Sequence, residues 1–159
     1  LEASRAVSGS KTYYKSFTQI NTRLVKRIKV DYKYDVVFNN GHMRKADVRI
    51  MVNDKLHAET NTEWKNTEYR IVENNEQEIT LTDQISHATI LLYFEEPTTI
   101  KSTYSEQDAS FNSMVSLGNH TYKKINTKGR ENIYHYENGV LKRIEVDGGL
   151  IKFEMIARE

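Results

Sequence analysis

A long run of alternating residues constrains the fold of this chain most. From residue 27 to residue 38, apolar or aromatic side chains occupy every even position, and charged side chains occupy the odd positions as far as Asp35. Leu24 extends the apolar set upstream. Because successive side chains of a β-strand point to opposite faces, this period of two predicts one hidden face and one wet face. We therefore predict a single strand from about Leu24 to Phe38.

The predicted strand is too long to be flat. Fifteen extended residues span about 50 Å at about 3.3 Å per residue, whereas an ordinary strand has about 5–6 residues. A flat strand of this length would run past a small core, so right-handed twist must coil it. We expect an all-β fold, a strongly curved antiparallel meander that forms a half-barrel or a barrel. Its concave side would carry Tyr32, Tyr34, Val36 and Phe38.

The same pattern of β-branched and aromatic residues, interrupted by Asn, Gly and Asp turns, recurs to the end of the chain. It predicts a meander of nine or ten strands. Besides the long strand, the predicted strands are 12–21, 46–52, 56–64, 111–117, 120–126, 130–137, 140–147 and 149–157. A short hairpin joins 69–72 to 78–81. In the strand 56–64, Leu56, Ala58 and Trp64 are expected to share one face.

Only the segment 82–97 departs from this pattern of strands and turns. Its apolar residues are spaced as on one face of a helix, Ser86 is a suitable N-cap, and Pro97 would end the helix. Ala, Leu and Glu favour a helix, and no turn residue precedes Ile90. We expect a short helix at about 86–95, in or across the concavity. A fully buried strand is the alternative.

The length of 159 residues fits one β domain, residues 1–159, which would bury about 68–70% of its unfolded surface. Leu1–Val7 resembles the end of an element, so this domain could lack an N-terminal strand. No basic and apolar leader opens the chain.

Charge and apolar runs argue against two classes of partner. The chain has 23 Lys and Arg against 22 Asp and Glu, so its net charge of +1 gives no general field that attracts nucleic acid. The longest apolar run, Ile90–Phe94, is far shorter than the roughly 18–20 residues that cross a bilayer. We expect neither a nucleic-acid partner nor a membrane-spanning segment. The absence of Cys excludes disulfides and thiolate metal sites.

Ten tyrosines raise the question of a pocket, since each combines a large apolar body with a hydroxyl that needs a partner when buried. One interpretation is that they are sheet residues, chosen for β-propensity and cross-strand packing. The other is a pocket for a lipid or another amphiphile. The candidate lining residues are Tyr32, Tyr34, Val36, Phe38, Trp64, Tyr134 and Tyr136.

Catalytic chemistry has little support in the sequence. Glu106 and Asp108 could approach His87 or His120, and such a group can bind a metal or transfer protons. Their spacing matches no ligand template, and a charged turn explains them as well. Nucleophile elbows, phosphate loops and paired-histidine motifs are absent from the sequence. We predict no enzyme activity, no cofactor and no metal.

Five segments carry a family resemblance: ILLYFEEP, YSEQDASFN, LGNHTYKKIN, KGRENIYHYENG and VDGGLIKFE. Their order resembles an uncharacterised family of small exported proteins from Bacteroidetes-type bacteria, described as a domain of unknown function, over about Lys11–Ile156. The chain is more distantly similar to another uncharacterised envelope family, in which a short helix follows a curved antiparallel sheet. The resemblance implies an upstream signal peptide and a periplasmic or cell-envelope location. It implies no functional residues.

Three hypotheses on function follow. The first is a non-enzymatic cell-envelope protein that binds an apolar or amphiphilic ligand in the concave face. The second is a scaffold that docks an envelope protein through a sheet edge. The third is a hydrolase that uses Glu106 and Asp108 with a histidine.

Overall fold

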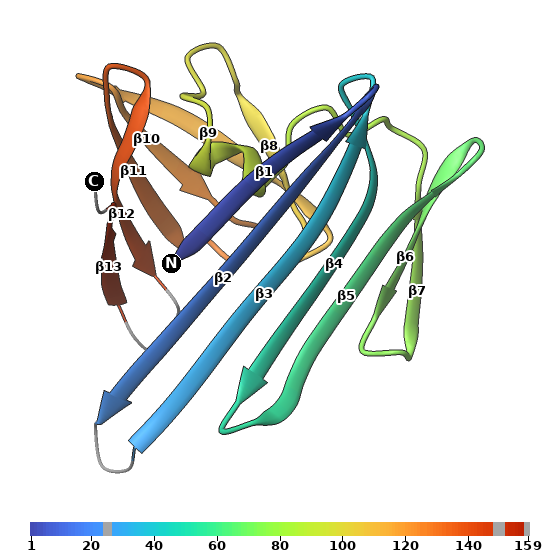
Figure 1. Cartoon of the computed structure of the whole chain (residues 1–159), viewed down its shortest axis with the longest axis horizontal. Helices are drawn as coiled ribbons and strands as arrows, with labels where there is room; N and C mark the ends of the chain where they lie inside the picture. Colours follow the sequence, from blue (N-terminus) through green and yellow to red (C-terminus); the bar gives the residue numbers. More distant parts are fainter. Residues whose placement is uncertain (24–26, 148–151, 158–159) are drawn as a thin grey trace. The chain divides into compact units, whose positions relative to one another are not determined.

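The computed structural model describes residues 1–23, 27–147 and 152–157 and contains two antiparallel sheets (Figure 1). The chain forms two compact units. The N-terminal unit comprises Leu1–Ser86 with Glu106–Ala109, and the C-terminal unit comprises His87–Ser105 with Ser110–Glu159. The expectation of one domain over residues 1–159 stays a prediction.

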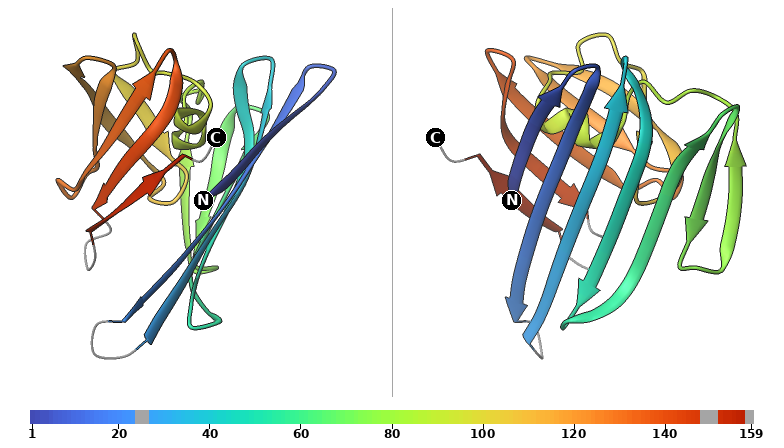
Figure 2. Two further views of the ribbon diagram at one scale, coloured as in Figure 1. Left: turned by 60° about the vertical axis from the view of Figure 1, so that its left-hand side comes forward. Right: turned by 45° about the vertical axis from the view of Figure 1, so that its right-hand side comes forward.

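The N-terminal unit is a seven-stranded meander in which each strand pairs with the next along the chain, as the right-hand view of Figure 2 shows. Its strands are β1 (Glu2–Ser8), β2 (Lys11–Arg23), β3 (Arg27–Asn39), β4 (His42–Val52), β5 (Lys55–Lys65), β6 (Glu68–Glu73) and β7 (Gln77–Leu81). The prediction of one long strand is confirmed, because β3 has 13 residues and pairs along its whole length with β2. Leu24 lies outside the described residues.

Alternation along β2 to β5 separates two faces of this sheet. One face carries mainly uncharged side chains on these four strands, and we call it the uncharged face; Lys55, which pairs with Val52, lies at its margin. Its members are Thr12, Tyr14, Ser16, Thr18, Ile20, Thr22, Ile28, Val30, Tyr32, Tyr34, Val36, Phe38, Met43, Ala46, Val48, Ile50, Val52, Ala58, Thr60 and Thr62. The opposite face carries ion pairs such as Lys15 with Asp35 at 3.4 Å and Arg49 with Glu59 at 2.7 Å. The predicted division into an uncharged and a charged face is therefore confirmed, but of the uncharged residues of β3 only Val36 and Phe38 are buried, and the others are half-buried.

A β-bulge corrects one part of the predicted register. Ile50 pairs with Ala58, but its neighbour Met51 pairs with Leu56, so β5 contains an extra residue at His57. The bulge moves Leu56 to the face of Met51, where 53% of it is exposed. The expectation that Leu56 shares a face with Ala58 is wrong. A bulge depends on the partner strand, and the period of two within β5 does not reveal it.

The C-terminal unit holds a six-stranded meander, in the order β13-β12-β11-β10-β9-β8. Its strands are β8 (Ser102–Ser105), β9 (Ser110–Gly118), β10 (Thr121–Ile125), β11 (Glu131–Glu137), β12 (Val140–Asp147) and β13 (Lys152–Ile156). Both sheets are open in the part of the chain that the structure describes, so the predicted curved meander is confirmed without closure into a barrel. Residues 148–151, which include the start of the predicted strand 149–157, lie outside the described residues.

The predicted short helix exists as η1, a 3-10 helix at Thr89–Tyr93. Leu92 of η1 packs in a core cluster with residues of the six-stranded sheet: Met114, Tyr122, Tyr134, Tyr136 and Ile144. The predicted cap is wrong, because the N-cap is Ala88 and no side chain caps the helix. Ala88 has extended backbone and forms a parallel bridge with Tyr104, so the chain is still strand-like where Ser86 was expected to begin a helix. No helix in the described part of the chain has the length and apolar composition that crossing a bilayer requires.

Candidate functional site

The candidate lining residues fall into two groups. Tyr32, Tyr34, Val36 and Phe38 lie on β3 and Trp64 on β5, all in the N-terminal unit, whereas Tyr134 and Tyr136 lie on β11 in the C-terminal unit. Four of the candidates therefore share strand β3 and two share strand β11, whereas Trp64 lies alone on β5.

Val36 and Phe38 belong to the core of the N-terminal unit. Val36 is 1% exposed and stands between Tyr14 of β2 and Ala46 of β4. Phe38 is 5% exposed and meets the Tyr14 ring edge-on, with 5.7 Å between the ring centroids. Burial of this kind stabilises the sheet.

Tyr34 contacts a segment that comes from much later in the chain. Its hydroxyl donates a hydrogen bond of 2.9 Å to Oε1 of Gln107. The Thr60 hydroxyl donates to the backbone carbonyl of Gln107, also at 2.9 Å. The segment Glu106–Ala109 is thereby attached to the sheet of the N-terminal unit. The sequence reasoning missed this attachment, since no local pattern links residue 34 to residue 107.

Tyr32 differs from Tyr34 because no hydrogen bond to its hydroxyl exists among the described residues. The side chain is half-buried, and burial raises the pKa of the Tyr32 hydroxyl. Its cross-strand neighbours are Thr18 of β2 and Ile50 of β4. A half-buried hydroxyl without a protein partner remains able to bind a ligand.

Partly buried aliphatic residues lie beside Tyr32 on the uncharged face. In the next row, Ile20 pairs with Val30, and Val30 pairs with Val52 on its other side. Ile28 follows one row further. All four side chains are half-buried. We call these four residues together with Tyr32 the distal face. It has one free hydroxyl and an otherwise apolar surface.

Trp64 is separate from the distal face. It packs edge-on against Tyr69, with 4.7 Å between the ring centroids, and the Arg44 guanidinium lies 5.7 Å from the centre of its ring. Tyr32 pairs with Ile50, which pairs with Ala58, six residues before Trp64 on β5. Six residues of extended chain span roughly 20 Å. Trp64 therefore cannot line the same small site as Tyr32.

Tyr134 and Tyr136 are core residues, 2% and 6% exposed. The Tyr136 hydroxyl donates a hydrogen bond of 2.6 Å to the carbonyl of Leu92, and its ring meets Tyr122 edge-on at 5.7 Å. Burial raises the pKa of the Tyr136 hydroxyl. This tyrosine ties η1 to the six-stranded sheet.

The carboxylates and imidazoles considered as one group belong to different units: Glu106 and Asp108 lie in the N-terminal unit, and His87 and His120 lie in the C-terminal unit. Glu106 is 1% exposed, whereas Asp108 lies on the surface, so the two carboxylates occupy different environments. His120 contacts Glu96 instead. In residues 1–23, 27–147 and 152–157, no group of three or more His, Cys, Asp or Glu is arranged to hold a metal ion.

A carboxylate that the sequence analysis missed organises part of the C-terminal unit. Oε1 of Glu96 accepts hydrogen bonds from the Tyr122 hydroxyl at 2.6 Å and from His120 Nδ1 at 2.8 Å. The bond to Glu96 raises the pKa of Tyr122 to about 12, and the bond from Tyr122 lowers the pKa of Glu96. Glu96 lies between the predicted helix and Pro97 in the sequence, and no motif marks it there.

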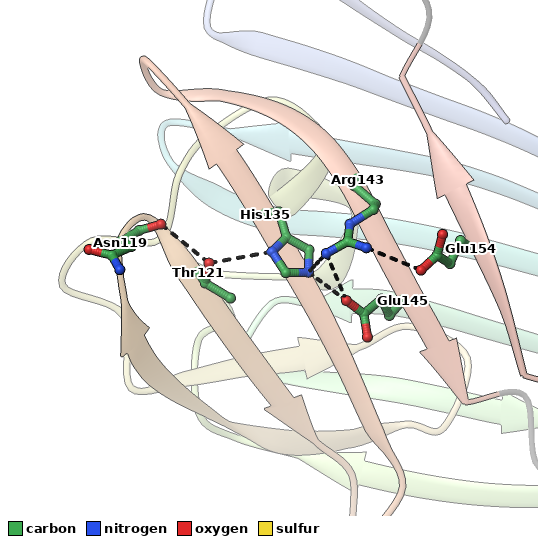
Figure 3. A network of polar contacts seen from close by, with 6 residues as sticks. All are labelled: Asn119, Thr121, His135, Arg143, Glu145 and Glu154. Carbon is green, nitrogen blue, oxygen red and sulfur yellow. Dashed lines mark hydrogen bonds and ion pairs between the residues drawn. The ribbon is translucent and has the colours of Figure 1, made fainter.

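A second polar network links β10 to β13 (Figure 3). Oε1 of Glu145 lies 2.8 Å from His135 Nε2 and 3.0 Å from Arg143 Nη2. Arg143 also pairs with Glu154 at 3.2 Å, and Nδ1 of His135 lies 3.4 Å from the Thr121 hydroxyl. Since an arginine can only donate, Glu145 is the shared acceptor of this group. The network connects neighbouring strands and has the character of a cross-strand contact.

Comparison with known proteins adds one finding. A family model described as a domain of unknown function (DUF6134) matches residues 1–158. No curated protein matches the chain, and no solved structure does. The resemblance to a family of unknown function is thus confirmed. Because the match covers nearly all of the sequence, the chain belongs to the DUF6134 family.

Proposed function

We propose that the chain is a non-enzymatic protein of the cell envelope that binds an apolar or amphiphilic molecule, such as a lipid, on the distal face of its N-terminal sheet. The observation that carries the proposal is the Tyr32 hydroxyl, which has no hydrogen-bond partner among the described residues and stands next to half-buried aliphatic side chains. One polar group beside an apolar surface suits a ligand with a small polar head and an apolar body.

The energetics are sufficient for such a ligand. Complete burial of an aliphatic or aromatic side chain contributes about 1.5–3 kcal/mol, so covering five half-exposed side chains contributes roughly 4–8 kcal/mol before the entropic cost of binding. A hydrogen bond to Tyr32 adds about 0.5–1.5 kcal/mol. None of the five residues of the distal face is charged, so covering them desolvates no ionised group, and Lys55 lies at its margin opposite Val52.

The envelope location derives from the resemblance to exported proteins and agrees with a chain that has no Cys. Fractionation of cells that express the full-length protein tests it. Recovery with periplasmic or membrane markers supports the proposal, and recovery with cytosolic markers contradicts it.

Binding is tested by native mass spectrometry of gently extracted protein and by titration with a fluorescent fatty acid. Val30→Asp places a charge on the distal face and should abolish binding, while Tyr32→Phe should weaken it about threefold to tenfold. Val140→Asp is the matched control, because Val140 is 57% exposed and lies in the other unit. Bare protein in every preparation together with no probe binding would refute the ligand-binding function.

A sheet edge supports the second candidate function, the docking of an envelope protein. β1 pairs with β2 and with no other strand in the described part of the chain, and all seven of its residues are exposed. An edge strand can add a strand from a partner. Ser4→Pro and Arg5→Pro each remove one backbone donor, and one of these two N–H groups faces outward. If both variants recover a defined envelope partner as well as the unsubstituted chain does, docking at this edge is excluded.

A further inference from the structure

A small cavity in the C-terminal unit lies beside η1 and the loop that follows it. Its volume is about 100 Å³, and its lining includes the aliphatic side chains of Ala88, Leu91, Leu92 and Ile100. A water molecule takes up about 30 Å³ of liquid, so the cavity has room for several waters or for one short carbon chain.

Thr103 gives this cavity a polar group that lacks a partner. The residue lines the cavity and is 0% exposed. Its Oγ1 is buried and makes no hydrogen bond to any residue that the structure describes. A buried hydroxyl without a partner costs free energy, so its presence indicates that a polar group occupies the neighbouring space.

Glu96 supplies a charge on the same lining. Its side chain is 8% exposed, and both hydrogen bonds that it accepts from described residues end on Oε1. Oε2 is therefore open to a further donor. Glu95 also lines the cavity, and His87 is the one cationic candidate there. The lining thus holds two carboxylates and one imidazole, and this balance of charge favours a bound cation over a bound anion.

We propose that this cavity binds a primary alkylammonium group, with a short unbranched carbon stem against the aliphatic wall. An ammonium has three N–H donors, which can serve Thr103 Oγ1 and Glu96 Oε2 together. A quaternary ammonium has no N–H donor and is normally bound by aromatic faces, and no Trp, Tyr or Phe lines this cavity. The group can belong to a free amine or to a lysine side chain.

The test uses the isotope-labelled full-length chain and its ¹H–¹⁵N spectrum. Titration with n-butylammonium chloride should move the amide signals of Ala88, Leu92 and Thr103 to saturation. At equal ionic strength n-butanol, sodium butyrate and tetramethylammonium chloride should not. Nα-acetyl-lysine methylamide distinguishes the two sources: saturation with this compound at least as tight as with butylammonium assigns the site to a lysine side chain, and weaker binding assigns it to a free amine.

Two variants test the assigned contacts. Glu96→Gln keeps an acceptor for Tyr122 but removes the charge, and it should weaken butylammonium binding about tenfold or more. Thr103→Val preserves the side-chain shape and should weaken binding about fivefold. Glu137→Gln is the matched control, because Glu137 is exposed and does not line the cavity. The proposal is overturned if butylammonium shifts do not saturate, if butanol produces the same shifts, or if Thr103→Val and Glu96→Gln both bind as well as the unsubstituted chain.

Discussion

Three buried tyrosines have hydroxyl groups with assigned acceptors in the described residues. Tyr69 donates to the carbonyl of Met43, Tyr122 to Glu96 and Tyr136 to the carbonyl of Leu92. Each bond joins residues at least 26 positions apart in sequence. These tyrosines connect elements, whereas Tyr32 has no such bond among the same residues. The difference separates structural tyrosines from the one proposed to bind a ligand.

Tyr122 should titrate late and make stability fall at alkaline pH. Its pKa is raised from 10 to about 12 because its hydroxyl donates to Glu96. The neutral form is thus stabilised by folding, so its contribution is fully present below about pH 10 and is lost as pH rises from about 10 to 12. Absorbance near 295 nm follows the titration, and urea unfolding follows stability. In Tyr122→Phe the step near pH 12 should lose the amplitude of one tyrosine, while the late titration of the buried Tyr136 remains. An unchanged amplitude near pH 12 would assign the step to another tyrosine.

Tyr69→Phe should destabilise the N-terminal unit by about 1–3 kcal/mol. Its hydroxyl donates to the carbonyl of Met43 at 2.7 Å and accepts from the N–H of Ile85 at 3.1 Å, and the residue is fully buried. The variant leaves two backbone groups without this partner. Urea unfolding measures the loss, with Tyr13→Phe, which is 37% exposed, as the control. Equal urea midpoints for Tyr69→Phe and Tyr13→Phe would contradict the structural role of the Tyr69 hydroxyl.

At the scale of elements, strands were predicted most accurately where one face of the strand is charged and exposed to solvent. β3 alternates between charged and uncharged side chains, and its strand was predicted within a few residues. β8 was missed because its last three residues, Thr103, Tyr104 and Ser105, are all buried, so no alternation exists to be read. β1 was missed for the opposite reason, since all seven of its residues are exposed. The described residues form thirteen strands, more than the nine or ten expected, and β1 and β8 are two of the additional ones.

The candidate site was predictable only in part. Alternation correctly placed Tyr32 on an uncharged face, but it could not separate Tyr32 from Tyr34, whose hydroxyl is bonded to Gln107. Alternation also could not distinguish Tyr32 and Tyr34 from Trp64, which belongs to the same sheet but lies near the far end of β5. These distinctions depend on pairs distant in sequence, which periodicity does not encode.

The turn between β11 and β12 tests the local rules. Asn138 and Gly139 have φ of 51° and 78°, as a two-residue hairpin turn requires. Gly139→Ala should therefore cost about 1–2 kcal/mol, since an L side chain is disfavoured in this region. Asn138→Gly, at a position with the same backbone preference, should be nearly neutral. Thermal unfolding compares the two. An Ala variant as stable as the Gly variant would show that the turn conformation is not limiting.

At the scale of the whole molecule, the chain passes between its two units three times. The boundaries fall after Ser86, Ser105 and Ala109, so Glu106–Ala109 belongs to the first unit although the second unit surrounds it in sequence. Gln107 of this segment accepts hydrogen bonds from the hydroxyl groups of Tyr34 and Thr60. The N-terminal unit is thus complete only after part of the C-terminal unit has been synthesised.

Such connectivity leads us to expect that the two units unfold together. The chain has one Trp, Trp64, whose fluorescence reports the N-terminal unit alone. Ile144→Ala acts in the C-terminal unit, where Ile144 is 2% exposed in the core cluster, and should cost about 2–5 kcal/mol. If unfolding is cooperative, this variant lowers the urea midpoint of Trp64 fluorescence as much as that of far-UV circular dichroism. Val140→Ala, at an exposed position of the same strand, should move neither midpoint. A fluorescence midpoint that stays fixed in Ile144→Ala would instead mean that the units unfold independently, because damage to one core would not reach the only tryptophan in the other.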